Sequence, residues 1–201
     1  MPEACIQAAQ SGSLGLALMS DVDDFIVCKR LLHSEADCAL LAQSLASVYR
    51  QVMASQASSW KLYLQGDLGV GKTSFVRSLL RALGVAERIK SPSFALMHSY
   101  PLSTGNDAHH FDFYRLERPG DWLGVGLEAS FDHPLDLVLV EWPEKALLPA
   151  WDLLLQWHWP EPSQARQLCL RARSDFDGQA AQAHAIWRKR KTPPMSSAGS
   201  I

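Results

Sequence analysis

The sequence predicts an α/β fold in which helices and strands alternate around a mostly parallel central sheet that also carries an antiparallel hairpin. Three observations support this prediction: short apolar runs of strand length, longer stretches with apolar residues at helical spacing, and glycine-rich turns between them. The chain has 201 residues, of which 47% are hydrophobic and 20% are charged. That balance is typical of one domain with a buried core, so disorder throughout the chain is excluded.

The charge and cysteine content exclude several function classes. The 19 Lys and Arg and 21 Asp and Glu residues give a formal net charge of −2, which offers no general attraction for nucleic acid or an anionic membrane. The 4 cysteines form no C-x-x-C pair, so neither a zinc cage nor a disulfide framework is indicated. No apolar run approaches the ~20 residues of a membrane span, and no secretory signal is evident. We therefore expect a soluble, cytoplasmic protein.

The chain divides into three regions. Residues 1–24 are small, polar and weakly patterned, so we expect a flexible N-terminal extension there. Residues 25–173 contain the periodic segments and form the expected domain. In residues 174–201, Gly, Ala and Gln give way to the basic run Arg188–Lys191 and a Pro/Ser end, which predicts a peripheral helix followed by a disordered basic tail.

The first elements of the domain are predicted to be a strand, a helix and a second strand. Phe25–Leu32 is an apolar-rich run of strand length. Ser34 and Asp37 form a variant capping box, which predicts a helix from there to about Met53. Trp60–Gln65 is short, aromatic and followed by glycine, as expected for a buried strand.

A second helix is predicted directly after the glycine-rich loop Gly66–Thr73. Apolar residues repeat at helical spacing along it, at Phe75, Val76, Leu79, Leu80 and Leu83. Gly84 follows where a left-handed cap would end the helix.

The second half of the domain is predicted to be rich in strands. Phe94–Tyr100 and Ala108–Tyr114 flank the turn-rich segment Pro101–Asp107, which predicts the antiparallel hairpin. Further strands are expected at Leu137–Val140, Leu153–Trp159 and Gln167–Ala172. The turn-forming segment Pro160–Ser163 separates the last two.

The loop GDLGVGKT at Gly66–Thr73 matches the phosphate-binding pattern G-x-x-x-x-G-K-[ST] at every fixed position. Because it joins a predicted strand to a predicted helix, it indicates a three-layer P-loop NTPase fold for residues 25–173. Its glycines let successive backbone N–H groups point at one phosphate, and the helix N-terminus adds favourable potential. An accidental glycine-rich turn is the alternative. The residues expected to bind the nucleotide here are Gly66, Asp67, Leu68, Gly69, Val70, Gly71, Lys72, Thr73 and Ser74.

Three polar side chains are expected to serve the phosphates and a magnesium ion. Lys72 should reach the β and γ phosphates, and the Thr73 hydroxyl should complete the Mg²⁺ shell. The strand Leu137–Glu141 consists of four apolar residues followed by an acid, so Glu141 is the second candidate for the metal. A strand-end carboxylate facing solvent is the alternative. No guanine-specific N-K-x-D segment is present, which favours ATP.

Asp112 lies in the otherwise aromatic run His109–Tyr114. A carboxylate in such a strand is expected either to have a polar or charged partner or to have a catalytic or binding role. It could orient or deprotonate the attacking water in phosphoryl transfer. A structural pair with Arg115 or Lys90 is the alternative. His109 and His110 suggest a metal site, but neighbouring strand residues point to opposite faces, so a surface or core role is favoured for both.

Five segments occur in an order that resembles the TsaE (YjeE) family of small bacterial P-loop ATPases. The similarity runs from about Val27 to Arg173. The segments are the loop GDLGVGKTS, SPSF at Ser91–Phe94, HHFDFYRL at His109–Leu116, the stretch around Gly126–Glu128, and VEWPEK at Val140–Lys145.

This resemblance implies an ATPase that acts with the TsaD and TsaB proteins in tRNA threonylcarbamoyladenosine biosynthesis. That assembly modifies the adenosine just 3′ of the anticodon in tRNAs reading codons that begin with A. By matched position, the resemblance implies that Lys72 binds the phosphates and that Thr73 and Glu141 bind the magnesium ion. It also implies that Asp112 is needed for hydrolysis and that Trp142 lies close to the nucleotide.

Some features of the family comparison leave alternatives open. Ser93 replaces the family's more frequent threonine, and Ser91 and Ser93 form either a loop that senses the γ phosphate or a simple turn. Arg188–Lys191 could contact tRNA phosphates, although a solvated tail is favoured. Two other function classes also fit the loop: a small-molecule kinase and a binding module gated by nucleotide.

Overall fold

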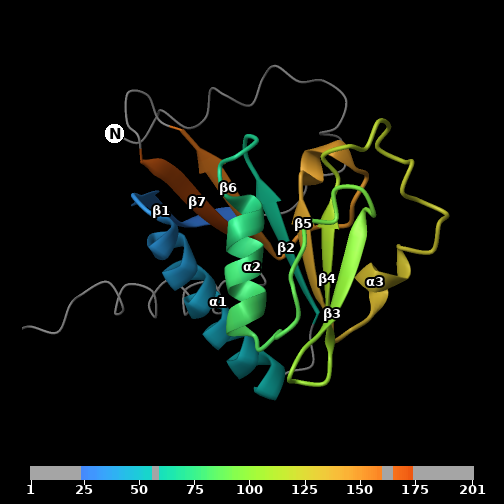
Figure 1. Cartoon of the computed structure of the whole chain (residues 1–201), viewed down its shortest axis with the longest axis horizontal. Coiled ribbons are helices and arrows are strands. Elements are labelled where there is room, and N and C mark those ends of the chain that lie inside the picture. The colour runs from blue at the N-terminus through green and yellow to red at the C-terminus, as the bar shows by residue number, and fades with distance from the viewer. Residues whose placement is uncertain (1–23, 56–58, 160–164, 174–201) are drawn as a thin grey trace, which may run out of the picture.

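The computed structural model describes residues 24–55, 59–159 and 165–173. Residues 1–23 of the expected N-terminal extension, the C-terminal helix and basic tail, and the turn at Pro160–Ser163 lie outside these ranges, whereas Asp24, expected in the extension, begins the first strand. The elements, shown in Figure 1, are β1 Asp24–Leu32, α1 Glu35–Ser55, β2 Trp60–Gln65, α2 Lys72–Ala82, β3 Met97–Pro101, β4 Asp107–Asp112, α3 Ala129–Asp132, β5 Leu137–Glu141, the 3₁₀ helix η2 Pro143–Lys145, β6 Leu153–His158 and β7 Arg166–Arg173.

The strands form one 7-stranded sheet in the order β1-β7-β6-β2-β5-β4-β3. The four central strands β6, β2, β5 and β4 pair in parallel. The pairs β1–β7, β6–β7 and β3–β4 are antiparallel, so only β3 and β7 run against the common direction. The expected α/β fold, with a mostly parallel sheet and an antiparallel hairpin at β3–β4, is confirmed.

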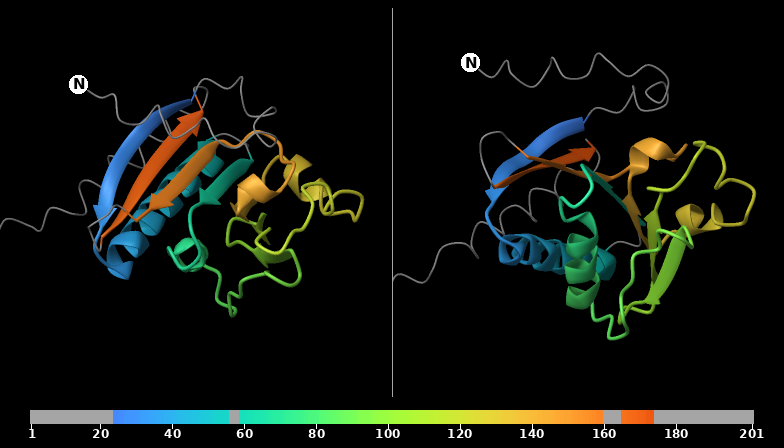
Figure 2. Two further views of the ribbon diagram at one scale, coloured as in Figure 1. Left: turned by 90° about the horizontal axis from the view of Figure 1, so that it is seen from above. Right: turned by 45° about the horizontal axis from the view of Figure 1, so that its top comes forward.

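Helices α1 and α2 cover one face of this sheet (Figure 2). Alternate strand residues point toward them, as the twofold period of a strand requires. Leu62 and Leu64 of β2, for example, belong to the same buried cluster as the apolar faces of both helices. Asp37 N donates to Ser34 Oγ at 3.2 Å, so the predicted cap of α1 at Ser34 is confirmed. Asp37 Oδ2 accepts the N–H of His33 at 2.9 Å, the residue before the cap.

The other face of the central strands is covered by a segment of little regular structure that contains α3 and η2. Its buried residues include Trp122, Phe131 and Trp151, which form a cluster with Phe111 of β4 and Val138 of β5. The Phe111 and Phe131 ring centroids are 5.0 Å apart. Most of the expected third layer is therefore loop held in place by aromatic side chains rather than by helices.

Both strands of the predicted hairpin are shorter than expected. Phe94–Leu96 is not strand, because Ala95 N donates to Pro92 O at 2.9 Å in a turn and Leu96 has the left-handed φ of 62°. β4 ends at Asp112 rather than Tyr114. The Asp112 side chain accepts the Tyr114 N–H at 3.0 Å. This local hydrogen bond turns the backbone out of the strand direction.

The sheet register brings three chain segments to one edge of the sheet. Leu64 of β2 is paired with Glu141 of β5, and Glu141 with Asp112 of β4. The carboxyl ends of these parallel strands therefore meet where the loop between β2 and α2 begins. Ligands in open α/β sheets bind at this edge.

Within the described residues, no helix is long and apolar enough to cross a membrane.

Candidate functional site

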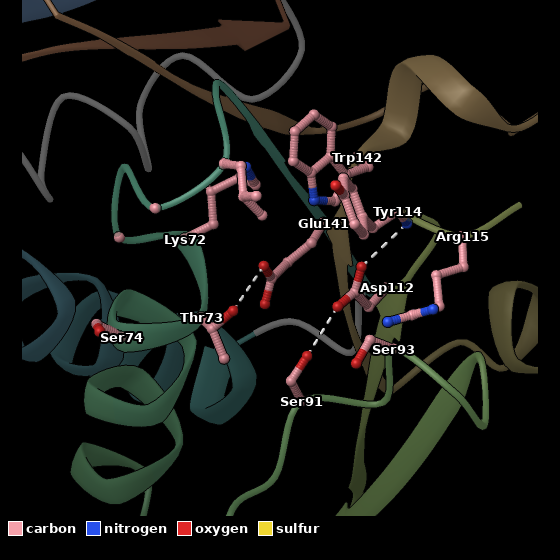
Figure 3. Close-up of a pocket in the computed structure, with 13 residues that line it drawn as sticks. Lys72, Thr73, Ser74, Ser91, Ser93, Asp112, Tyr114, Arg115, Glu141 and Trp142 are labelled. Atoms are coloured by element: carbon pink, nitrogen blue, oxygen red, sulfur yellow. Dashed lines mark hydrogen bonds between the residues drawn. The ribbon is translucent and has the colours of Figure 1, made fainter.

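A cavity of about 360 Å³ opens at this edge of the sheet. Figure 3 shows the side chains that line it converging from the loop, from α2, from the ends of β4 and β5, and from the chain before β3. Its lining residues are Leu68, Gly69, Gly71, Lys72, Thr73, Ser74, Ser91, Ser93, Asp112, Tyr114, Arg115, Glu141 and Trp142.

The loop from Gly66 to Gly71 has a backbone that L side chains rarely adopt. Gly66, Gly69 and Gly71 have φ values of 143°, 79° and 111°. A Cβ on Gly66 would lie 2.7 Å from the Trp157 carbonyl oxygen, so that position cannot carry a side chain without moving β6. Arg166 Nη1 donates to Val70 O at 3.1 Å and ties the loop to β7. Glycine therefore permits both the curl of the loop and its close approach to the sheet.

Lys72, the first residue of α2, is almost completely buried and points back along the loop. Its ammonium donates to Gly66 O and to Asp67 O, the latter at 3.0 Å. It also lies 3.7 Å from the ring centroid of Trp142. Burial lowers the pKa of Lys72, while the nearby Glu141 carboxylate opposes that shift. The ammonium is thus a poorly hydrated positive charge inside the cavity, a state that an anion would stabilise.

Thr73, Glu141 and His110 form a chain of hydrogen bonds from the cavity into the sheet. Thr73 Oγ1 donates to Glu141 Oε2 at 2.8 Å, and His110 Nε2 lies 2.9 Å from Glu141 Oε1. The Glu141 side chain is 3% exposed and that of His110 is 0% exposed. Thr73 and His110 therefore contact different oxygens of the Glu141 carboxyl group and together fix its orientation. The alternative of a solvent-facing Glu141 does not apply.

Asp112 is buried at the end of β4, opposite the loop. Its Oδ2 accepts a hydrogen bond from Ser91 Oγ at 2.7 Å, and its Oδ1 accepts the Tyr114 N–H. The polar partners of Asp112 are therefore a hydroxyl and a backbone amide, and not Arg115 or Lys90. The Asp112 side chain borders the cavity (Figure 3), and neither hydrogen-bond partner forms an ion pair with it.

Trp142 directly follows Glu141 and has a left-handed φ of 59°. Its ring centroid is 5.0 Å from that of Tyr114, and its other close neighbour is the Lys72 ammonium. A bulky residue in this conformation costs about 1–3 kcal/mol, and such strain clusters at functional sites. Here it places the indole in the cavity wall beside the lysine.

The structure brings together most of the sequence-predicted site residues but not all of them. Gly66, Asp67 and Val70 do not line the cavity. Val70 is fully buried below the loop, and Gly66 and Asp67 contribute the carbonyls that hold Lys72. All other predicted positions line it.

Sequence reasoning missed three residues of this site as functional groups. Tyr114 and Arg115 line the cavity, and His110 positions Glu141. The sequence suggests Arg115 only as a partner for Asp112, but its guanidinium carbon lies 4.2 Å from the ring centroid of Phe94. For His110, the available signal was its place two residues before Asp112, on the same strand face.

His109 is separated from the site. Its Nδ1 lies 2.8 Å from Ser99 Oγ and its Nε2 lies 3.0 Å from Asp136 Oδ2, whereas His110 contacts Glu141. The two histidine rings therefore meet different carboxylates. In the described ranges, no group of three or more His, Cys, Asp or Glu side chains is arranged to hold a metal ion by itself.

The cavity combines the donors and acceptors that a magnesium-bound phosphate chain needs. The backbone curl at the start of α2 and the Lys72 ammonium suit an anion. The Thr73 hydroxyl and the Glu141 and Asp112 carboxylates are hard oxygen donors, which Mg²⁺ prefers while keeping several of its waters. The arrangement can therefore accept a phosphorylated ligand on one side and present charged oxygen atoms on the other.

Comparison with known proteins identifies the family to which this sequence is similar. A family model described as "Threonylcarbamoyl adenosine biosynthesis protein TsaE" matches residues 32–168. The tRNA threonylcarbamoyladenosine biosynthesis protein TsaE of Haemophilus influenzae is 38% identical over 96 residues, which cover 47% of this chain and 60% of that protein. The protein of the same name from Synechocystis is 37% identical over 99 residues, covering 42% and 54%. The matched part thus spans only about half to three fifths of these relatives.

A solved structure shares the fold. The crystal structure of YdiB from Bacillus subtilis matches with a TM-score of 0.59 and 21% sequence identity, covering 84% of this chain and 97% of that chain. At this level of identity, the likeness supports the α/β fold and not a shared activity.

Proposed function

Since the chain belongs to the TsaE family, with a role in tRNA threonylcarbamoyladenosine biosynthesis, we propose that it is the subunit that binds and hydrolyses ATP. The observation that carries this proposal is the convergence of Lys72, Thr73, Asp112 and Glu141 on one cavity. These are the residue types that hold a triphosphate and its magnesium, and they come from elements that the sheet register fixes.

The loop and the start of α2 would hold the phosphates. Gly69, Gly71 and Ser74 border the cavity with Lys72, and the backbone N–H groups of such a curl favour negative charge. Phosphate oxygens would replace the Gly66 and Asp67 carbonyls as partners of the Lys72 ammonium. Because that ammonium is buried, its attraction for the phosphate would be stronger than between the same charges in water.

Thr73 and Glu141 would hold the magnesium, directly or through its water shell. The ion supplies charge neutralisation for the phosphates. Glu141 is oriented by His110 and Thr73, so its direction is fixed without any rearrangement. Trp142 would border the nucleotide from the β5 side of the cavity.

Asp112 would orient or deprotonate the attacking water. Its carboxylate borders the cavity and is held by Ser91 and by the Tyr114 amide. A positioned acceptor of this kind contributes roughly 10²–10⁴-fold to the rate. Ser91 and Ser93 would then report phosphate occupancy to the chain before β3, since Ser91 bonds the carboxylate that faces the reacting group.

The tRNA role would depend on partner proteins. The family resemblance points to TsaD and TsaB, with ATP turnover supporting their transfer of a threonylcarbamoyl group to the adenosine 3′ of the anticodon. The formal charge of −2 gives this chain little affinity of its own for tRNA. Depleting the protein should leave the tRNA without the modified adenosine.

Three substitutions test the proposed division of labour. Lys72→Ala should abolish ATP binding because it removes the buried positive charge. Asp112→Ala and Glu141→Ala should retain much of the binding but reduce phosphate release by roughly 100-fold or more. Binding is measured with a fluorescent ATP analogue, and turnover by phosphate release with and without TsaD and TsaB. Asp132→Ala, an exposed carboxylate outside the cavity, is the matched control.

The same measurements separate the alternatives. Equal loss of ATP affinity in all three variants would contradict the assigned roles. A binding module gated by nucleotide would keep its partner binding in Asp112→Ala, with no effect of turnover on tRNA modification. A small-molecule kinase would release no phosphate in response to the partners.

A further inference from the structure

Arg166, the first residue of β7, contacts the loop between β2 and α2 from a distant part of the chain. Its Nη1 donates to Val70 O at 3.1 Å, across 96 positions of the sequence. A Cβ on Gly71 would lie 2.7 Å from the same nitrogen, so the guanidinium occupies the space beside Gly71 that a side chain would need. Arg166 is half-buried and does not line the cavity. It therefore contacts the loop without entering the nucleotide site.

Arg166 brings a positive charge to the loop as well as a hydrogen-bond donor. Within the part of the chain that the structure describes, no Asp or Glu forms an ion pair with it. Burial raises the pKa of the Cys38 thiol of α1 to about 11, and the Arg166 charge opposes that rise. A hydrogen bond from a charged donor is shorter and stronger than one from a neutral donor. The contact with Val70 O is therefore able to fix the orientation of the peptide that carries it.

The peptide between Val70 and Gly71 links this contact to the cavity. In a trans peptide, the carbonyl oxygen and the following N–H point in opposite directions. Because the Val70 oxygen faces Arg166, the Gly71 N–H points away from Arg166. Gly71 lines the cavity, and among the described residues its N–H has no hydrogen-bond partner. One peptide thus connects the guanidinium on β7 to an unused donor of the loop.

We propose that Arg166 is a positioning residue for the nucleotide: it holds the Val70–Gly71 peptide so that the Gly71 N–H donates to a phosphate oxygen. This inference rests on the proposed function for the identity of the ligand. A cation bonded to the carbonyl also polarises the peptide, which makes its N–H a stronger donor. Because the peptide is oriented before the ligand arrives, binding carries less entropy cost at this position.

The effect of Arg166 belongs to binding rather than to the chemical step. Backbone donors of such a loop hold the α and β phosphates, which ATP and ADP share. An interaction that is equally strong in the ground state and the transition state changes KM and leaves kcat unchanged. Arg166 should therefore set the affinity for both nucleotides, whereas Asp112 and Glu141 are proposed to act on turnover.

The test uses the full-length chain with magnesium and measures the Kd of ATP and of ADP, together with kcat and KM for phosphate release. Arg166→Met removes the charge and the donors but keeps a long side chain. It should raise the Kd of both nucleotides by roughly 10-fold and change kcat by less than about twofold. Arg166→Lys keeps a charge and a donor, so it should bind both nucleotides more tightly than Arg166→Met. In the unaltered chain, ADP should slow hydrogen exchange of the Gly71 amide, measured by NMR.

Arg81→Met is the matched control for Arg166→Met. Arg81 Nη1 donates to the Val85 carbonyl at 2.7 Å, which is the same type of hydrogen bond beyond the other end of α2. Urea unfolding gives the stability that each variant loses. Arg81→Met should bind ATP and ADP like the unaltered chain whatever stability it loses, because its carbonyl partner does not belong to the loop.

Several results would overturn the inference. They are unchanged nucleotide affinity in Arg166→Met, an equal loss of affinity in Arg81→Met, binding by Arg166→Lys no better than by Arg166→Met, and no effect of bound ADP on exchange at Gly71. Loss of ATP affinity with ADP affinity retained would also overturn it, since the guanidinium would then act on the γ phosphate. An unaltered chain that binds neither nucleotide would overturn the proposed function itself, and this inference with it.

Discussion

Single residues of the site are held by polar partners inside the protein, and a buried polar group without a partner is costly. Glu141 illustrates the principle, because Thr73 and His110 bond its two oxygens. His110 Nδ1 has no hydrogen-bond partner among the described residues. The ring is therefore held through Nε2 alone, by its contact with Glu141.

The Cys38 thiol of α1 predicts a dependence of stability on alkaline pH. Burial raises its pKa from 9.0 to about 11, because the thiolate is disfavoured in the core. The folded-state pKa lies above the unfolded value, so the stabilisation is fully present below about pH 9 and is lost as the pH rises through about 11. At about 1.4 kcal/mol per pKa unit, the loss is at most about 2–3 kcal/mol.

Urea unfolding measured at about pH 8 and at about pH 10.5 would show this loss. Cys38→Ala, compared with the unaltered chain, removes only the thiol's part of the pH dependence. Lys72 contributes with the opposite sign, because its pKa is lowered on folding, and the comparison cancels that contribution. An identical pH dependence in both chains would contradict the assignment.

At the scale of elements, the loop between β2 and α2 depends on glycine at Gly66. Gly66→Ala should lower the free energy of unfolding by about 2–4 kcal/mol, since it adds a contact with the Trp157 carbonyl to the cost of a positive φ. Gly105→Ala is the matched control, because Gly105 has a φ of 87° with nothing within 4 Å of an added Cβ. It should cost only about 1 kcal/mol. Chemical denaturation compares the two, and equal costs would exclude the role of the carbonyl.

Most elements were predictable because local patterns determine them. β2 has the bounds that its apolar run predicts, and α2 begins within the glycine loop and ends just before Gly84, which has a φ of 98°. The errors fall at Phe94–Leu96 and after Asp112. There, a turn and a side-chain bond to the Tyr114 amide compete with the strand. Aromatic and apolar content favours a strand, but it does not encode such backbone bonds.

For the whole molecule, ligand binding and stability should be linked. A ligand that binds only the folded state stabilises it by about 2.7 kcal/mol at 100 times its Kd. For a chain of this size, Mg²⁺ and ATP should then raise Tm by roughly 5–10 °C. Differential scanning fluorimetry measures the shift.

Lys72→Ala is the control for this measurement, since it should show no shift at the same ATP concentration. Asp112→Ala should still show most of it, because the role proposed for its carboxylate is to act on the attacking water and not to bind the phosphates. A Tm that ATP leaves unchanged in the unaltered chain would contradict nucleotide binding at this cavity.

The sequence by itself determined the glycine-rich loop Gly66–Thr73, the α/β order of elements and the family resemblance, because each depends on residues close together in the chain. Only the tertiary structure decided which side chains meet. Thr73 and Glu141 are 68 positions apart, and Ser91 and Asp112 are 21 apart. Their contacts, and the contact of Arg166 with Val70, depend on strand order, register and helix packing. Those features result from burial of the whole core, which a local pattern does not specify.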